Sequence, residues 1–268
     1  MRTLKLTLAY DGTSYAGWQL QPERPTLQGA LERAIRQVTG QGGDILAAGR
    51  TDAGVHALGQ IVRWRTASPL PAEVLCRALN AVLPRDMAVL GVAEAAGSFH
   101  PIRDAVRKRY RYVICDGPVR DPFQLRYSWH CPHCRLDAEA MRRSASGLVG
   151  RHDFRSFQSS GAERRTTVRT IFDFPVERGR GGRENFVDFE VEANGFLYNM
   201  VRALIGTLVQ VGNGRRPVDW PGEVLRAGDR RVAGPTAPPQ GLFLLKVDYG
   251  EGAGQGGRAS GSVAAGSG

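Results

Sequence analysis

The residue types best suited to chemistry in this chain lie in one run at 49–57, Gly-Arg-Thr-Asp-Ala-Gly-Val-His-Ala. It follows an apolar run at 45–48 and precedes a second expected strand at 60–65, which predicts a loop between two strands. Its glycines permit backbone angles and close ligand approach that other residues resist. Asp52 offers a carboxylate for acid–base or nucleophilic work, and Arg50 offers a nearby cation. Taken alone, an Asp-Ala-Gly triplet is also typical of a turn-capping aspartate beside a surface arginine.

A second candidate surface lies at 107–112, Arg-Lys-Arg-Tyr-Arg-Tyr. Strand alternation places Tyr110 and Tyr112 on one face and the three arginines on the other. Aromatic rings interleaved with cations suit stacked nucleobases and phosphates. The same pattern is as typical of two core tyrosines with a solvated basic reverse side.

Composition points to a folded protein with a polyanionic partner. The 268 residues are 42% hydrophobic, enough for a core, and carry a net charge of +10. Surplus cations attract phosphates and gain affinity by releasing counterions, so nucleic acid is the leading candidate. We expect a cytoplasmic protein, because no apolar run reaches about 18 residues and the first residues alternate like a strand.

Cysteine and histidine cluster at 130–134, His-Cys-Pro-His-Cys. Two cysteines at this spacing beside histidines can bind zinc, but a closed site needs four ligands in tetrahedral geometry. The sequence has no second pair of cysteines or histidines with zinc spacing, so we expect a loop or strand end and no metal. Four cysteines in all are too few for a disulfide scaffold, which fits a reducing compartment.

Hydrophobic periodicity predicts the order β-α-β-β-α-β for the first hundred residues. The expected strands are 3–10, 44–48, 59–66 and 86–95, and the expected helices are 26–39 and 71–82. A Pro-Thr start at 25–26 and Gly40 as a stop support the first helix. This order is the ferredoxin-like arrangement, an antiparallel sheet with both helices on one face.

The same order is predicted again after residue 105. It comprises strands at 107–115, 168–177, 185–193 and 241–249 and helices at 137–149 and 197–211. We expect an α+β fold in which ferredoxin-like halves at 1–104 and 105–249 join into one mostly antiparallel sheet. All helices would cover one face, and a basic central cleft would lie on the other. The Gly-, Ala- and Ser-rich segment at 250–268 cannot repay the entropy of ordering, so a disordered tail is expected.

The run at 49–57 resembles the signature of the tRNA pseudouridine synthase A family. Further motifs agree in order: Tyr-Asp-Gly-Thr-Ser-Tyr-Ala-Gly-Trp-Gln at 10–19, Gly-Phe-Leu-Tyr-Asn-Met-Val-Arg at 195–202 and Pro-Gln-Gly-Leu at 239–242. The resemblance covers nearly the whole chain to Tyr249 and implies the pseudouridine synthase fold. It implies that Asp52 is the essential catalytic residue, that Arg202 is the cation paired with it, and that Tyr110 stacks on the target uracil. Tyr112 is then assigned to the core.

The resemblance also implies a substrate and an assembly. The family isomerises uridine to pseudouridine in the anticodon stem-loop of tRNAs, at tRNA positions 38–40, and works as a homodimer. The reaction breaks the N-glycosidic bond of a flipped uridine and rejoins the uracil through C5, so it needs no cofactor. Three roles for Asp52 use the same residues: bonding to the anomeric carbon, addition to the ring, and proton abstraction from the sugar.

Other site residues complete the expectation. Arg50 is the second candidate cation for Asp52, being close in sequence. For substrate binding we expect Tyr110 to be joined by basic and polar side chains that position tRNA through its phosphates, namely Arg109, Arg111, His56 and Arg165.

Two other function classes fit the charge. A non-catalytic RNA-binding protein of the same fold would have this composition, and the intact Asp52 argues against it. A DNA-binding protein would be expected to show a helix-turn-helix or zinc module, which the sequence lacks.

Overall fold

The first four strands and two helices of the chain form a ferredoxin-like unit. The structure is a computed structural model that describes residues 1–132, 135–159, 161 and 166–250. The elements of this unit are β1 (Arg2–Tyr10), α1 (Leu27–Thr39), β2 (Asp44–Ala47), β3 (His56–Thr66), α2 (Ala72–Val82) and β4 (Met87–Ala95). Strand β4 pairs with β1, β1 with β3, and β3 with β2, all antiparallel. The predicted element order is confirmed, and the tail beyond residue 250 lies outside the described residues.

The second part of the chain repeats this strand order with additions. Its elements are β5 (Ala105–Cys115), β6 (Trp129–His130), α3 (Ala138–Ser146), β7 (Gly150–Asp153), β8 (Val168–Asp173), β9 (Val176–Arg178), β10 (Phe186–Ala193), α4 (Met200–Gly212), α5 (Trp220–Ala227) and β11 (Leu242–Tyr249). Short 3₁₀ turns lie at Arg155–Phe157, Arg230–Val232 and Pro239–Gly241. The order β11-β5-β10-β8 matches β4-β1-β3-β2 position for position.

The strands expected at 59–66 and 107–115 begin earlier, at His56 and Ala105, and three further elements differ for identifiable reasons. The strand expected at 168–177 is divided into β8 and β9 around Pro175, which has no N–H for the ladder. Helix α4 begins at Met200 rather than 197 because Asn199 has a left-handed backbone, with φ 58°. The helix expected at 137–149 ends at Ser146, and β7 follows. Helix α5 was not predicted.

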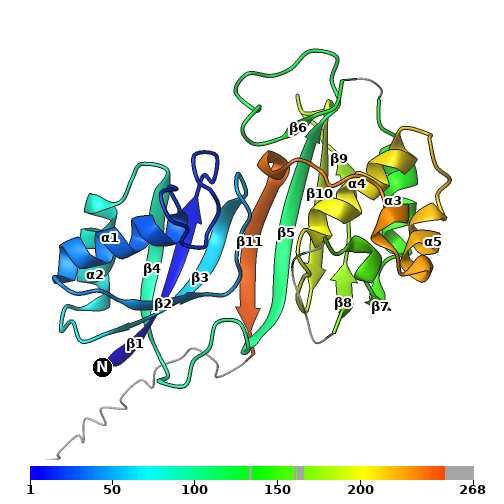
Figure 1. Cartoon of the computed structure of the whole chain (residues 1–268). Helices are drawn as coiled ribbons and strands as arrows, with labels where there is room; N and C mark the ends of the chain where they lie inside the picture. Colours follow the sequence, from blue (N-terminus) through cyan, green and yellow to red (C-terminus); the bar gives the residue numbers. More distant parts are fainter. Residues whose placement is uncertain (133–134, 160, 162–165, 251–268) are drawn as a thin grey trace, which may run out of the picture.

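One sheet runs through the molecule and is joined at its centre by β3 and β11. These two strands are parallel, with Phe243 beside His56 and Leu244 beside Ala57, whereas the other pairings among the main strands are antiparallel. Gly59 permits this approach, because a Cβ there would overlap the Leu245 carbonyl. Figure 1 shows β11 and β5 in the middle of the sheet.

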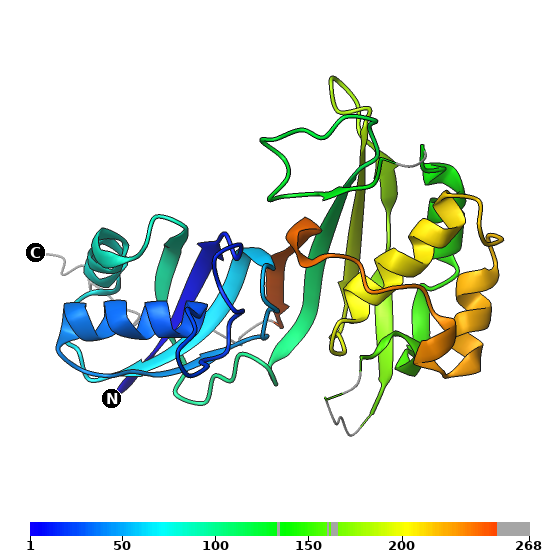
Figure 2. The same ribbon diagram turned by 45° about the horizontal axis from the view of Figure 1, so that its top comes forward.

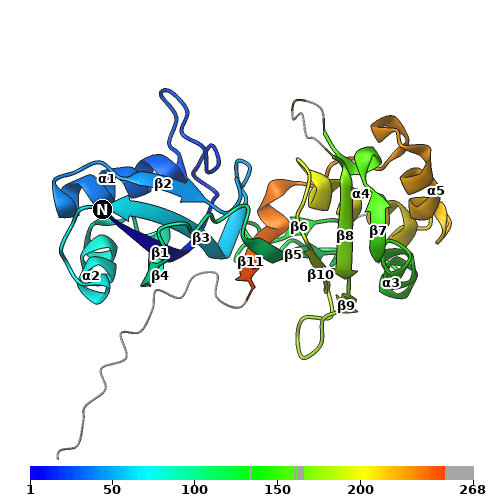
Figure 3. The ribbon, with the colours of Figure 1, turned by 90° about the horizontal axis from the view of Figure 1, so that it is seen from below.

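The helices form two groups on either side of these central strands. Figure 2 shows α1 and α2 on one flank and α3, α4 and α5 on the other, and Figure 3 shows the same separation from below. Helix α1 is capped as its sequence predicts, since the Thr26 side chain accepts from the Gly29 N–H and Gly40 is left-handed. No helix in the described part of the chain is both long and apolar enough to cross a membrane.

Candidate active site

The loop between β2 and β3 places Asp52 at the junction of the two helix groups. Gly54 turns the chain with φ +77°, and the Val55 N–H donates to the Asp52 carbonyl at 3.1 Å. Gly12, from the segment after β1, packs so closely that a Cβ would overlap the Val55 carbonyl. The loop is therefore fixed by neighbouring backbone, while 29% of the Asp52 side chain remains exposed.

The cation facing Asp52 comes from helix α4. Arg202 Nη1 donates to Asp52 Oδ2 at 3.1 Å, across 150 residues of sequence. The guanidinium is held from behind, because its Nε donates to the Ala237 carbonyl at 2.7 Å and Nη1 also donates to Asn199 Oδ1 at 2.9 Å. Within the described residues, Asp52 Oδ1 has no hydrogen-bond partner. One carboxylate oxygen is thus anchored and the other is available to a substrate.

Tyr110 lies beside this pair. Its ring is 9% exposed and meets Phe196 edge-on, with centroids 5.0 Å apart. Burial raises the pKa of the Tyr110 phenol, and nearby Tyr10 and Asp52 raise it further. The phenol therefore stays protonated and neutral at physiological pH. Tyr112, two residues along the same strand, is 1% exposed and donates to the Pro238 carbonyl at 2.8 Å.

The site lies on the face of the sheet that α4 covers. Tyr110 and Tyr112 point to this side, where the Arg202 side chain extends from α4 and contacts Asp52. The active site therefore does not lie on the helix-free face, where the cleft was expected. The physical reason is that the cation is carried by a helix, so its carboxylate partner must point toward that helix.

Arg50 and His56, the other predicted residues of the run at 49–57, form no hydrogen bond or ion pair with the Asp52 side chain in the part of the chain that the structure describes. His56 is 1% exposed, and its ring is bonded to protein on both nitrogens. Nδ1 accepts from the Gly12 N–H at 3.1 Å, and Nε2 lies 2.8 Å from the Arg126 carbonyl. This geometry holds the loop in place, because burial and bonding leave the ring no open position for RNA.

The predicted arginines of β5 lie on the opposite face. Arg109 is paired with Glu190 and Glu192 at 3.0 Å each, which raises the pKa of its guanidinium despite partial burial. The guanidinium of Arg111 lies over the Phe243 ring, 5.2 Å from its centroid. Arg165 lies outside the described residues. The structure therefore separates Tyr110 from Arg109 and Arg111, as alternation along a strand requires.

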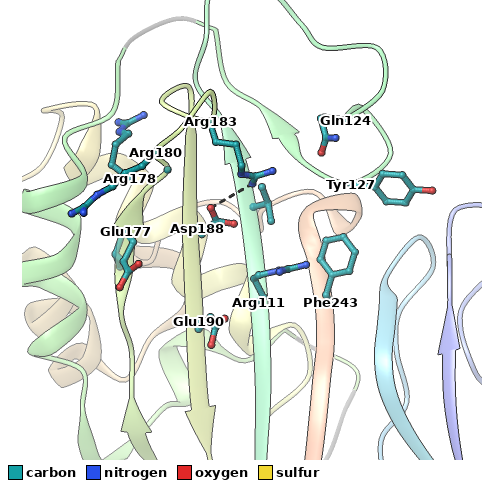
Figure 4. A pocket seen from close by; sticks show the side chains of 13 residues that line it. Arg111, Gln124, Tyr127, Glu177, Arg178, Arg180, Arg183, Asp188, Glu190 and Phe243 are labelled. Carbon is teal, nitrogen blue, oxygen red and sulfur yellow. Dashed lines mark ion pairs between the residues drawn. The ribbon is translucent and has the colours of Figure 1, made fainter. Parts of the chain in front are cut away.

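Arg111 lines an open hollow of about 980 Å³ on that opposite face. Figure 4 shows Arg111 and Phe243 on its floor, with Tyr127 and Gln124 on one side and Arg180 and Arg183 on the other. Two of its three acids have partners: Asp188 is 3.5 Å from Arg183, and Glu190 is paired with Arg109. The Phe243 ring also stacks on His56, with centroids 4.7 Å apart. The hollow therefore lies behind the β3–β11 junction, on the side opposite Asp52.

Several residues of the site were missed from sequence. The Tyr10 hydroxyl is 2.9 Å from Thr51 Oγ1, and Gln60 Nε2 donates to the Gly49 carbonyl at 2.7 Å. Asn199 bonds the guanidinium of Arg202 from one helical turn away. Tyr10 and Asn199 had a sequence signal, since both lie in the family motifs at 10–19 and 195–202, whereas Gln60 had none.

No metal site emerges from the described residues. Among them, no group of three or more His, Cys, Asp or Glu side chains is placed to hold an ion. His133 and Cys134 of the cluster at 130–134 lie outside the described residues. The His130 ring bonds the Gly117 carbonyl at 3.0 Å.

Comparisons with known proteins agree over most of the chain. A family model described as tRNA pseudouridine synthase matches residues 7–101 and 145–250. The tRNA pseudouridine synthase A of Thermoanaerobacter sp. (strain X514) is 44% identical over 249 residues, covering 93% of this chain and 100% of the relative. The enzyme of that name from Moorella thermoacetica is 47% identical over 251 residues, covering 93% and 100%.

A third relative and a solved structure extend the comparison. The tRNA pseudouridine synthase A of Myxococcus xanthus is 45% identical over 252 residues, covering 94% of each chain. A chain from the crystal structure of a Cbf5-Nop10-Gar1 complex aligns with a TM-score of 0.35 and 12% identity, covering 85% of this chain and 69% of that one.

Proposed function

The chain belongs to the tRNA pseudouridine synthase family and is thus an isomerase of tRNA uridine, and we propose that its targets lie in the anticodon stem-loop, at tRNA positions 38–40. The observation that supports isomerisation is the contact of Asp52 with Arg202 beside the Tyr110 ring, and the tRNA positions rest on the resemblance to the tRNA pseudouridine synthase A relatives. A carboxylate, a cation and a flat ring are the groups that this isomerisation needs.

Each residue has a distinct role in this proposal. Asp52 is the catalytic carboxylate, which acts on the flipped uridine through its free Oδ1. Arg202 keeps the carboxylate aimed by holding Oδ2 at 3.1 Å. Tyr110 offers its ring to the uracil. During the reaction the C1′–N1 bond breaks, a C1′–C5 bond forms, and the proton on C5 is lost while N1 gains one, so no cofactor is consumed.

In the same proposal, the surrounding residues bind the tRNA or hold the catalytic residues in position. Arg50 and Arg165 carry cations that can contact phosphates of the tRNA, in keeping with the net charge of +10. His56 positions the Asp52 loop from below, and Arg109 and Arg111 stiffen the reverse face of the strand that presents Tyr110.

The proposal extends to organisation. Halves at 1–104 and 105–249, each with the strand order of a ferredoxin-like sheet, would form one functional unit. The protein would act in the cytoplasm as a homodimer. Light scattering on the purified chain tests the assembly, and a mass of one chain, 29.1 kDa, would contradict it.

Pseudouridine mapping at single-nucleotide resolution tests the function. Unmodified tRNA transcripts are incubated with the wild-type protein and with Asp52→Asn, which keeps the side-chain size and removes the carboxylate. We expect new pseudouridine at positions 38–40 with the wild type and none with a variant that still binds tRNA. Modification elsewhere in the tRNA would overturn the assigned positions, and modification by both proteins would overturn the role of Asp52.

A further inference from the structure

The backbone just before Asp52 is held by side chains from three different strands. The Gly49 carbonyl accepts from Gln60 on β3, and Thr51 Oγ1 is bonded to Tyr10 on β1. The preceding carbonyl, that of Ala48, accepts from Lys108 Nζ on β5 at 2.6 Å. Gln60 and Tyr10 belong to the same half of the chain as the loop, whereas Lys108 belongs to the other half.

Lys108 shares its strand face with Tyr110. Residues two apart on a strand point to the same side and are separated by about 6.5–7 Å along the strand. Lys108 pairs with Ala193 and Val247 on the neighbouring strands β10 and β11, so its backbone is fixed in the middle of the sheet. The ammonium stands beside the loop, since a Cβ added to Gly49 would lie 3.6 Å from Nζ.

We propose that Lys108 is a positioning residue of the reaction, fixing the Asp52 loop of one half of the chain against the strand that carries Tyr110 in the other. The inference rests on the proposed function, because it assigns Lys108 the task of setting the spacing between the carboxylate and the ring. A charged donor makes a stronger hydrogen bond to a carbonyl than a neutral one does. Arg202 fixes the carboxylate end of the loop, and Lys108 fixes its start.

The geometry favours positioning over direct contact with RNA. Nζ is directed to a backbone carbonyl four residues before Asp52, and the side chain is partly buried at the junction of the halves. A cation bound mainly to tRNA phosphate would instead act on affinity and on its salt dependence. The two roles therefore predict different measurements.

The test compares Lys108→Met, Lys108→Arg and a control, Lys246→Met. The control removes the same charge from a half-exposed lysine on β11 whose partner is Asp248. Single-turnover rates with saturating enzyme report the chemical step without binding. Because small misplacements of reacting groups cost large factors in rate, we expect Lys108→Met to slow this step by about 10-fold or more. We expect Lys108→Arg to recover most of the rate and Lys246→Met to match the wild type.

Binding and folding measurements accompany the rates. We expect the Kd for tRNA and the slope of its salt dependence to stay close to wild type in Lys108→Met. A weaker Kd with a shallower salt slope and an unchanged single-turnover rate would make Lys108 a phosphate contact and overturn the inference. If the rate of Lys108→Met falls only in proportion to the folded fraction, measured by circular dichroism, the role of Lys108 is merely structural. The same conclusion follows if Lys108→Arg recovers none of the rate.

Amide hydrogen exchange separates this inference from the proposed function. The Val55 N–H, bonded to the Asp52 carbonyl, reports the order of the loop without any reaction. We expect faster exchange at 48–55 in Lys108→Met than in Lys246→Met. Unchanged exchange would overturn the positioning role even in an active enzyme. If the wild-type protein forms no pseudouridine, the proposed function is contradicted. Faster exchange in Lys108→Met would then still show that Lys108 anchors the loop.

Discussion

Two aspartate–arginine pairs in this molecule differ in how completely the carboxylate is satisfied. Asp116 is fully buried, and its oxygens accept from Arg178 at 2.6 and 2.8 Å, from Arg135 at 3.4 Å and from the Leu136 N–H at 2.9 Å. Asp52 is 29% exposed and accepts from Arg202 alone among the described residues.

The difference separates structure from chemistry. A carboxylate whose lone pairs are all used, in the absence of water, has none left for a substrate. Asp116 therefore ties the segment just before α3 to β9, whereas Asp52 keeps one oxygen for a reacting group. The presence of an arginine partner is common to both and is no guide to function.

The largest expected effect concerns the unsatisfied pair. Asp52→Asn removes the reacting carboxylate, so we expect the single-turnover rate of pseudouridine formation to fall by at least about 10³-fold. Because the Asp52 side chain makes few hydrogen bonds, we expect the melting temperature of the Asp52→Asn variant to stay within about 3 °C of wild type. For a domain of this size that shift corresponds to roughly 1 kcal/mol. A large loss of stability would show that Asp52, like Asp116, has a structural role.

Removal of the cation comes next. Arg202→Met leaves the carboxylate without its anchor while keeping an unbranched side chain in α4. We expect a rate about 10²-fold lower, comparable with the loss of one preorganised charged donor at an active site. Asn199→Ala, which removes one support of the guanidinium, should give a smaller loss. Equal rates for wild type and Arg202→Met would contradict the role of the pair.

The satisfied pair should show the reverse behaviour. Asp116→Ala strands the Arg178 and Arg135 cations and the Leu136 N–H, so we expect the free energy of unfolding to fall by about 3 kcal/mol. Urea unfolding measures this loss. The rate per folded molecule should be unchanged, and a selective loss of rate with normal stability would erase the distinction between the pairs.

The smallest effect concerns pH and His56. Burial lowers the pKa of the His56 ring, although the Asp11 carboxylate 3.1 Å from Nδ1 opposes the shift. The unfolded chain then takes up a proton at higher pH than the folded one, so this contribution to stability is complete above about pH 6.5 and is lost as pH falls below it. The slope from one such group is at most about 1.4 kcal/mol per pH unit.

Unfolding free energies at pH 7.5 and 5.5 for the wild type and His56→Gln check this prediction. We expect the wild type to lose more stability on acidification than the variant, because glutamine does not titrate. Parallel losses in the two proteins would show that the pKa of His56 is the same in the folded and the unfolded chain.

Local sequence determined most elements and the identity of the principal residues. Helix α1 follows from its apolar period with Thr26 and Gly40 at its ends, and the turn at Asp52 follows from Gly54, because these residue types favour the local backbone conformations. The alternation at 107–112 correctly separated the tyrosines from the arginines. These features depend on contacts within a few residues, which a sequence shows directly.

The tertiary structure alone decided which side chains meet. Residue types near Asp52 do not indicate that its partner is Arg202, 150 residues away, rather than Arg50, two residues away; only the family resemblance of the run at 195–202 implied it, and the fold brings the two together. The same holds for Lys108 on the Ala48 carbonyl and for the face of the sheet that carries the site. Such contacts depend on how β3 and β11 join the two halves, and a residue's type and local period carry no information about a partner on a distant strand or helix.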